Sequence, residues 1–240
     1  MSDMTGKVAL VTGGSRGIGL ATARALASCG ASIAITGTVD ETLAAACRDL
    51  ERGAAGRVLA VRADVRSASD MATACDAVKS RFGGLDALIN NAGVGLFRAV
   101  GEMTDDEWRR LFDTNVTGVF NATRAALPHL RARGGGWIVN VSSLSATAPF
   151  ANGAAYCATK AAVDAFTEAL MQEVRHDGIR VSSVAPGSVD TTFGGAGRDK
   201  SSWALQPDDV AQVIVDLMGH AGRSLPSRVE VRPSQPPRKG

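Results

Sequence analysis

The chain has 240 residues, 45% of them hydrophobic, and a net charge of only +2 from 26 basic and 24 acidic residues. This size supports a sizeable core and favours one domain, although the length alone also permits two. The near-balance of charge excludes a broad basic surface for nucleic acid or an anionic membrane. No stretch resembles a signal peptide or reaches membrane-spanning length, so we expect a cytoplasmic protein. Four scattered cysteines and three isolated histidines indicate neither a disulfide framework nor a metal site.

Short runs rich in β-branched residues alternate with longer alanine-rich stretches along the whole chain. The short runs predict strands at 7–12, 32–36, 58–62, 86–90, 137–142, 179–184 and 228–231. The longer stretches predict helices at 17–29, 40–52, 67–82, 104–133, 155–177 and 207–219. We expect a break in the 104–133 helix, because Gly118 weakens it and Pro128 lacks a backbone donor. Parallel strands need crossover connections, so the alternation predicts one α/β domain with a doubly wound, Rossmann-type parallel sheet of about seven strands and helices on both faces.

Ligands bind such sheets beyond the carboxyl ends of the strands. The loop after the first predicted strand reads Gly13-Gly14-Ser15-Arg16-Gly17-Ile18-Gly19. Its glycines let the backbone approach a pyrophosphate closely, and the free amides of the following helix favour negative charge. The spacing alone is weak evidence, since a tight turn is the alternative. The position between the first strand and the first helix favours a dinucleotide site.

Tyr156 is the only tyrosine in the chain, and it stands four residues before Lys160 and thirteen after Ser143. Residues four apart share one face of a helix. An ammonium at ~4 Å and an effective dielectric of ~20 favours the phenolate by about 4 kcal/mol, so we expect the pKa of the phenol to move toward neutral pH. Such a phenol protonates the alkoxide that hydride addition to a ketone produces. The alternative is a buried aromatic residue whose hydroxyl has found a partner.

These motifs resemble those of the short-chain dehydrogenase/reductase family over nearly the whole chain. The resemblance rests on the glycine loop, on Asn90-Asn91-Ala92-Gly93, on Tyr156 with Lys160, and on residues 186–191. It implies catalytic roles for Asn115, Ser143, Tyr156 and Lys160, in which Ser143 bonds the substrate oxygen and Asn115 holds a water that links the lysine to solvent. We expect Ser142, the neighbour of Ser143, to face the sheet instead. The resemblance also implies pairing into a homodimer or homotetramer.

The same resemblance implies the residues that bind the cofactor. The segment 64–65 flanks the adenine, Asn91 and Gly93 line the ribose and nicotinamide, and Val189 and Thr191 hold the carboxamide. The full set is Gly13, Ser15, Arg16, Gly17, Ile18, Gly19, Thr38, Asp64, Val65, Asn91, Ala92, Gly93, Tyr156, Lys160, Pro186, Gly187, Val189 and Thr191. No metal ion is implied.

The choice between NADP(H) and NAD(H) depends on the residues after the second strand. An acidic residue directly after this strand bonds the ribose 2'-hydroxyl of NAD, whereas arginine or small polar groups accommodate the 2'-phosphate of NADP. Here Gly37 and Thr38 follow the strand, and Thr38 to Glu41 reads as a capping box that places Asp40 in the first turn of a helix. Arg16 is then free to pair with a 2'-phosphate, as in similar family members. We favour NADP(H); the alternative is that Asp40 reaches the ribose.

The sequence indicates the substrate less clearly than the cofactor. Phe97, Leu144, Phe150, Phe193 and Trp203 lie on the loops expected to form its pocket, although each also suits ordinary packing. We expect residues 187–206 to form a substrate lid and residues 233–240 a basic tail. The predicted function is NADP(H)-dependent interconversion of a ketone or aldehyde and an alcohol, similar to that of 3-oxoacyl-carrier-protein reductases. The alternatives are a dehydrogenase of a 3-hydroxy acid or other small secondary alcohol, which the C-terminal segment favours, and a non-catalytic nucleotide sensor.

Overall fold

Seven short strands form one parallel sheet in the order β3-β2-β1-β4-β5-β6-β7 in the computed structural model, which describes residues 3–194 and 202–236. The strands are β1 (Val8–Val11), β2 (Ser32–Gly37), β3 (Val58–Arg62), β4 (Ala87–Asn90), β5 (Gly136–Val141), β6 (Ile179–Pro186) and β7 (Arg228–Val231). The central strands β1 and β4 are buried along their whole length, as expected for a sheet covered on both faces. The sheet is therefore the predicted one. Its order reverses between β1 and β4, where a ligand crevice is expected.

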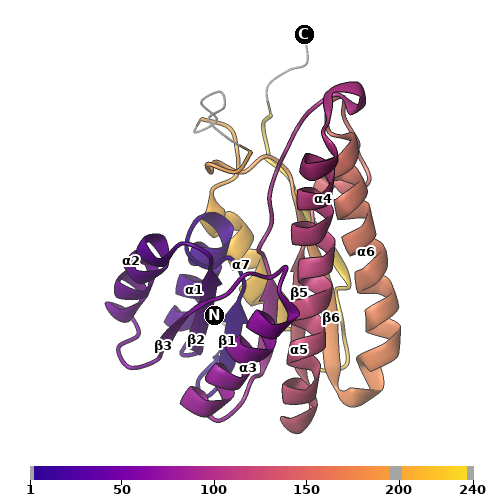
Figure 1. Ribbon diagram of the computed structural model, residues 1–240. Helices are drawn as coiled ribbons and strands as arrows, with labels where there is room; N and C mark the ends of the chain where they lie inside the picture. Colours follow the sequence, from indigo (N-terminus) through magenta and orange to yellow (C-terminus); the bar gives the residue numbers. More distant parts are fainter. Residues whose placement is uncertain (1–2, 195–201, 237–240) are drawn as a thin grey trace.

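The helices cover the two faces of this sheet (Figure 1). On one face α1 (Gly17–Ser28), α2 (Asp40–Glu51) and α7 (Pro207–Met218) enclose a core that contains Leu26, Leu50 and Ile214. On the other face α3 (Ala68–Phe82), α5 (Gly118–Ala132) and α6 (Ala154–Val174) enclose a second core, and α4 (Asp105–Phe112) leads into α5. Within the described residues, no helix has both the length and the apolar character needed to cross a membrane.

The break predicted within 104–133 lies next to Gly118 and not at Pro128. The chain forms a π-helical turn at Asp113–Thr117, immediately before Gly118, and α5 then continues through Pro128 to Ala132. A proline inside a helix costs roughly 3 kcal/mol. The helix persists because Ala126 and Leu130 on either side of the proline are fully buried in the second core. Tertiary packing thus overrides the local preference.

A buried polar network ties the ends of β4 and β5 to the helices behind them. Asn90 donates to Thr123 on α5 at 3.1 Å and to Asn140 on β5 at 2.8 Å. Asn140 in turn donates to Thr167 on α6 at 2.8 Å. These hydrogen bonds favour one arrangement of the strands and helices, because a buried polar group that loses its partner costs free energy. The network therefore sets the position of α6 relative to the carboxyl ends of the strands.

Candidate active site

The loops at the carboxyl ends of the strands enclose a cleft of about 1460 Å³. Its volume exceeds that of a typical small-ligand pocket, which is about 300–1,000 Å³, and suits a dinucleotide together with a substrate. All the predicted catalytic and cofactor-binding residues line this cleft except Gly19 and Asn115, which lie behind its wall. Of the residues predicted for the substrate pocket, only Trp203 does not line it. The cleft is also lined by Arg66, Val94, Arg110 and Thr114, which the sequence analysis missed. Of these, Arg66 and Val94 carried a sequence signal, since they directly follow the predicted contacts at 64–65 and 91–93.

The glycine loop forms a cradle that side chains would fill. Gly13 has φ of +62°, and a Cβ there would lie 2.9 Å from the Cα of Ala92. Gly17 also has a positive φ, and a Cβ there would meet only Thr191 on the opposite side of the cleft. Helix α1 begins at Gly17 without a side-chain cap and without an acidic residue in its first turn. The free amides and the open backbone therefore fit a pyrophosphate group.

Asn91 holds the glycine loop against the loop that follows β4. Its side-chain amide donates to the carbonyl oxygens of Thr12 at 3.0 Å and Gly13 at 3.1 Å. A Cβ on Gly19 would overlap this amide. Gly19 therefore acts from behind the wall by leaving room for Asn91, which explains why it does not itself line the cleft.

The loop after β3 is fixed at the predicted adenine end. Asn121 on α5 donates to the carbonyl oxygen of Val65 at 3.0 Å, and the missing side chain of Gly118 leaves room for Val65. The carboxylate of Asp64 accepts from the Nε atom of Arg66 at 3.0 Å. Hydrogen bonds from the Arg66 guanidinium hold the pKa of Asp64 below its usual value. Asp64 is therefore ionised and oriented at the edge of the cleft.

The start of α2 differs from the prediction. The N-cap of α2 is Val39, which makes no side-chain cap, so the predicted Thr38 capping box does not form. Thr38 lies one residue too early for this role and lines the cleft instead. Asp40 is in the first helical turn as expected, but its carboxylate pairs with Arg62 at 3.6 Å, and it does not line the cleft.

Tyr156 and Lys160 lie on the first turns of α6, and both are buried at the cleft. The Lys160 ammonium donates to the carbonyl oxygen of Val141 at 2.8 Å and lies 5.9 Å from the centroid of the Tyr156 ring. Burial lowers the pKa of Lys160 to about 8, against the opposing effect of the Asp164 carboxylate. Both groups thus sit where loss of water favours their neutral forms.

Burial raises the pKa of Tyr156 to about 12, and the nearby Ser143 hydroxyl opposes this rise. This direction is the reverse of the one expected from the spacing of Tyr156 and Lys160. The expectation counted the attraction of the ammonium, whereas the largest effect on the pKa of Tyr156 is the burial of the phenol. The phenol therefore keeps its proton throughout the physiological pH range.

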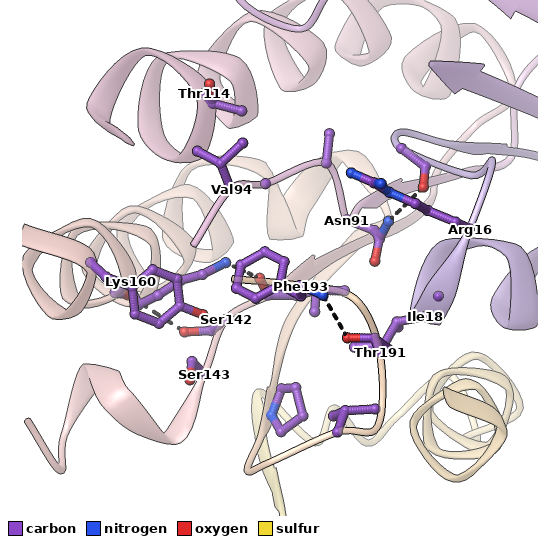
Figure 2. Close-up of a pocket in the computed structure, with 18 of the residues that line it drawn as sticks. Arg16, Ile18, Asn91, Val94, Thr114, Ser142, Ser143, Lys160, Thr191 and Phe193 are labelled. Atoms are coloured by element: carbon purple, nitrogen blue, oxygen red, sulfur yellow. Dashed lines mark hydrogen bonds between the residues drawn. The ribbon is translucent and has the colours of Figure 1, made fainter. Parts of the chain in front are cut away.

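The two adjacent serines point in different directions (Figure 2). The Ser143 hydroxyl donates to the Ser145 hydroxyl at 3.0 Å and accepts from the Ser145 amide at 3.1 Å. The Ser142 hydroxyl donates at 3.5 Å to the carbonyl oxygen of Lys160 in the interior. Ser143 therefore presents its oxygen to the cleft beside the phenol, and Ser142 is bonded to the backbone of α6.

Asn115 lies in the π-helical turn and is almost completely buried. Its side-chain oxygen accepts from the Val94 amide at 2.8 Å, and its side-chain nitrogen donates to the Val94 carbonyl at 3.0 Å and to the Thr159 hydroxyl at 3.1 Å. These bonds fix the loop after β4 to α6. Protein groups thus engage both polar atoms of the Asn115 side chain. The water-holding role implied for Asn115 stays a prediction.

The segment after β6 closes the cleft on the side of α7. Asp190 donates its amide to the Leu205 carbonyl at 2.8 Å, and the Thr191 hydroxyl accepts from the Phe193 amide at 3.2 Å (Figure 2). Residues 195–201 of the predicted lid, which include Arg198 and Lys200, lie outside the described residues, as does 237–240 of the predicted tail. Among the residues that are described, no three His, Cys, Asp or Glu side chains gather in a way that would hold a metal ion.

Comparison with known proteins identifies the family of this chain. Residues 7–201 match the model of the short chain dehydrogenase family. An uncharacterised oxidoreductase of Methylorubrum extorquens is 38% identical over 95% of this chain and 97% of its own length. A metagenomic short-chain oxidoreductase solved in complex with NADP is 36% identical, with a TM-score of 0.85 over 98% of this chain and all of that one.

A second solved structure is similar over almost the same span. The 3-ketoacyl-(acyl-carrier-protein) reductase of Brucella melitensis, solved with NADH, is 31% identical, with a TM-score of 0.88 over 95% of this chain and 97% of that one. Sequence and fold therefore agree along nearly the whole length. This chain belongs to the short-chain dehydrogenase/reductase family of NAD(P)-dependent oxidoreductases.

Proposed function

We propose that this protein reduces a ketone or aldehyde to an alcohol with NADPH. The observation that carries the proposal is the meeting of Tyr156, Lys160 and Ser143 in the same cleft as the glycine cradle. A bound nicotinamide supplies the hydride for such a reduction. When substrate binds, the Ser143 hydroxyl turns its proton from Ser145 to the substrate oxygen, where negative charge develops. The Tyr156 phenol transfers its proton to the same oxygen. The carbonyl carbon thus gains a hydride and the oxygen gains a proton.

The raised pKa of Tyr156 supports the reductive direction. Reduction needs a neutral acid, and burial keeps this phenol protonated well above neutral pH. Oxidation of an alcohol needs the phenolate as a base, and that form is scarce at neutral pH when the pKa of the phenol is about 12. The same active site therefore starts the reductive reaction from its dominant protonation state.

A preference for NADPH is supported by the residues around the predicted 2'-phosphate position. Ser15, Arg16 and Thr38 line the cleft there, and they offer a guanidinium and two hydroxyls. Asp40, the residue that would favour NAD, is paired with Arg62. The two solved relatives differ in this respect, since one was solved with NADP and the other with NADH.

Arg16→Ala tests this preference. Loss of a charged hydrogen bond to phosphate costs roughly 1.5–3 kcal/mol, so we expect the KM for NADPH to rise about tenfold or more and the KM for NADH to change less than about twofold. The matched control is Arg24→Ala, which removes an arginine on α1 that pairs with Asp49 on α2 and does not line the cleft. Equal effects of Arg16→Ala on both cofactors would show that its guanidinium does not bind the 2'-phosphate.

Within this proposal, 3-oxoacyl thioesters and esters are the first substrates to test, because the Brucella melitensis relative is a 3-ketoacyl-(acyl-carrier-protein) reductase. The experiment is a panel of small ketones, 3-oxoesters and acyl thioesters, run with NADPH and NADH in parallel. Turnover of at least one ketone supports a reductase, whereas cofactor binding without any turnover supports the nucleotide sensor. We also propose a homo-oligomer that pairs through α5 and α6; the exposed ring of Phe120 on α5 supports such a contact.

A further inference from the structure

We infer that the substrate carries an aromatic ring close to its carbonyl group and that this ring binds against Phe97 and Phe150, under Phe193. This inference rests on the proposed carbonyl reduction and adds the chemical class of the substrate to it. It starts from three phenylalanines on three separate loops. Phe97 follows β4, Phe150 precedes α6, and Phe193 follows β6.

The three rings gather around the phenol that we propose as the acid. The centroid of Phe97 lies 5.3 Å from that of Tyr156 with the two planes at 82°, and 5.6 Å from that of Phe150. The centroid of Phe193 also lies close to that of Tyr156, at 5.9 Å. Figure 2 shows Phe193 directed from the Thr191 segment into the cleft. An aromatic wall therefore adjoins the reacting end of the cleft.

Two glycines in the backbone leave room for two of these rings. A Cβ on Gly95 would lie 2.5 Å from the Cε1 atom of Phe193. A Cβ on Gly194, which has φ of +82°, would lie 2.7 Å from the Cε2 atom of Phe97. Any larger residue at either glycine would displace the ring that faces it. Each of these two rings thus packs against a glycine of the other loop, where a larger side chain would occupy its space.

The three rings keep much of their surface exposed although they contact other rings. Phe97, Phe150 and Phe193 retain 43%, 46% and 42% of their accessible surface, although each contacts another ring. The exposed apolar surface faces the cleft, so a ligand that covers it gains free energy by removing that surface from water. The described part of the protein does not cover this apolar surface.

An aromatic ligand matches this wall better than an alkyl chain or an acid does. Aromatic pairs gain energy from edge-to-face and offset contacts at centroid distances of about 4.5–7 Å, beyond the burial of their surface. The neighbouring wall residues Val94, Leu144 and Ala148 carry no charge, and the nearby Arg98 is paired with Glu107 at 3.0 Å. A free carboxylate on the substrate therefore gains nothing from Val94, Leu144, Ala148 or the paired Arg98, although Arg110 on α4 also lines the cleft.

The experiment compares 1-phenyl-2-propanone with 1-cyclohexyl-2-propanone at saturating NADPH. The two ketones have the same number of heavy atoms, and the carbonyl is conjugated in neither, so the ring alone differs. We expect kcat/KM to be about tenfold higher for the phenyl ketone, which corresponds to one or two aromatic contacts. Phe97→Leu, which keeps apolar bulk but removes the ring, should reduce this preference to within about twofold.

The control is Phe82→Leu, which removes a ring that does not line the cleft, at the carboxyl end of α3 shortly before β4 begins, and should leave the preference unchanged. Equal kcat/KM for the two ketones, or a preference that persists in Phe97→Leu, would overturn the inference while leaving carbonyl reduction intact. If neither ketone is turned over, the dissociation constants of 1-phenyl-2-propanol and 1-cyclohexyl-2-propanol for the NADP⁺-saturated protein decide. Tighter phenyl binding that is lost in Phe97→Leu supports the aromatic site, and equal or absent binding overturns it.

Discussion

Tyr156→Phe lowers kcat for ketone reduction by about 10²- to 10⁴-fold, the usual contribution of a positioned proton donor. The substitution removes the phenolic hydroxyl and keeps the ring, so the ring contacts with Phe97 at 5.3 Å and Phe193 at 5.9 Å persist. The substrate wall and the cofactor cradle are then unchanged. The loss therefore falls on the chemical step. It is measured as kcat at saturating NADPH and ketone.

The binding of NADPH serves as the control for this variant. Because the hydroxyl is proposed to act on the substrate oxygen, the dissociation constant of NADPH should change less than about threefold, which is a change below about 1 kcal/mol. A variant that binds NADPH normally and retains most of the wild-type kcat would show that another group, or water, protonates the alkoxide.

Lys160→Met lowers kcat by about a hundredfold. A unit charge at roughly 6 Å and an effective dielectric of about 20 is worth about 3 kcal/mol to the negative charge that develops on Tyr156 and the substrate oxygen. Methionine fills most of the space of the buried lysine stem but brings no charge. It also leaves the Val141 carbonyl, which accepts from the ammonium at 2.8 Å, without that donor. The matched control is Lys79→Met, which removes an exposed lysine on α3.

The pH profile separates the charge of Lys160 from its packing. Burial lowers the pKa of Lys160 to about 8, so the ammonium is charged below that pH and neutral above it. The phenol keeps its proton throughout, because its pKa is raised to about 12. We therefore expect kcat/KM for ketone reduction to be level below pH 8 and to fall as the pH rises through about 8. The break should be absent in Lys160→Met; a break that persists there belongs to another group.

The parts of the site that depend on local spacing were predictable from the sequence. The turn of α1, the shared helical face of Tyr156 and Lys160, and the separate directions of Ser142 and Ser143 each follow from a few consecutive residues. The loops that line the cleft were predictable because all follow strands of one parallel sheet and so meet at one edge. Local rules sufficed for these features but not for the start of α2, where the predicted Thr38 capping box does not form.

Features set by distant packing were not predictable in this way. The pKa of Tyr156 depends on how deeply the assembled loops bury it, and no spacing along the chain reports that burial. Pro128 remains inside α5 because the second core holds the residues around it. The contact of Gly194 with Phe97 joins loops almost a hundred residues apart, so each ring taken alone was compatible with ordinary packing.

The central claim, that Tyr156 is a buried neutral acid beside the cofactor, is tested most directly by its titration. As the chain has a single tyrosine, phenolate absorbance near 295 nm reports on Tyr156 alone. In the free protein we expect little phenolate until the pH approaches about 12, with circular dichroism showing that the fold persists. Because the oxidised nicotinamide carries a positive charge, saturation with NADP⁺ should lower the midpoint. A midpoint near ~10, the value of a phenol in water, both with and without NADP⁺ would contradict the account.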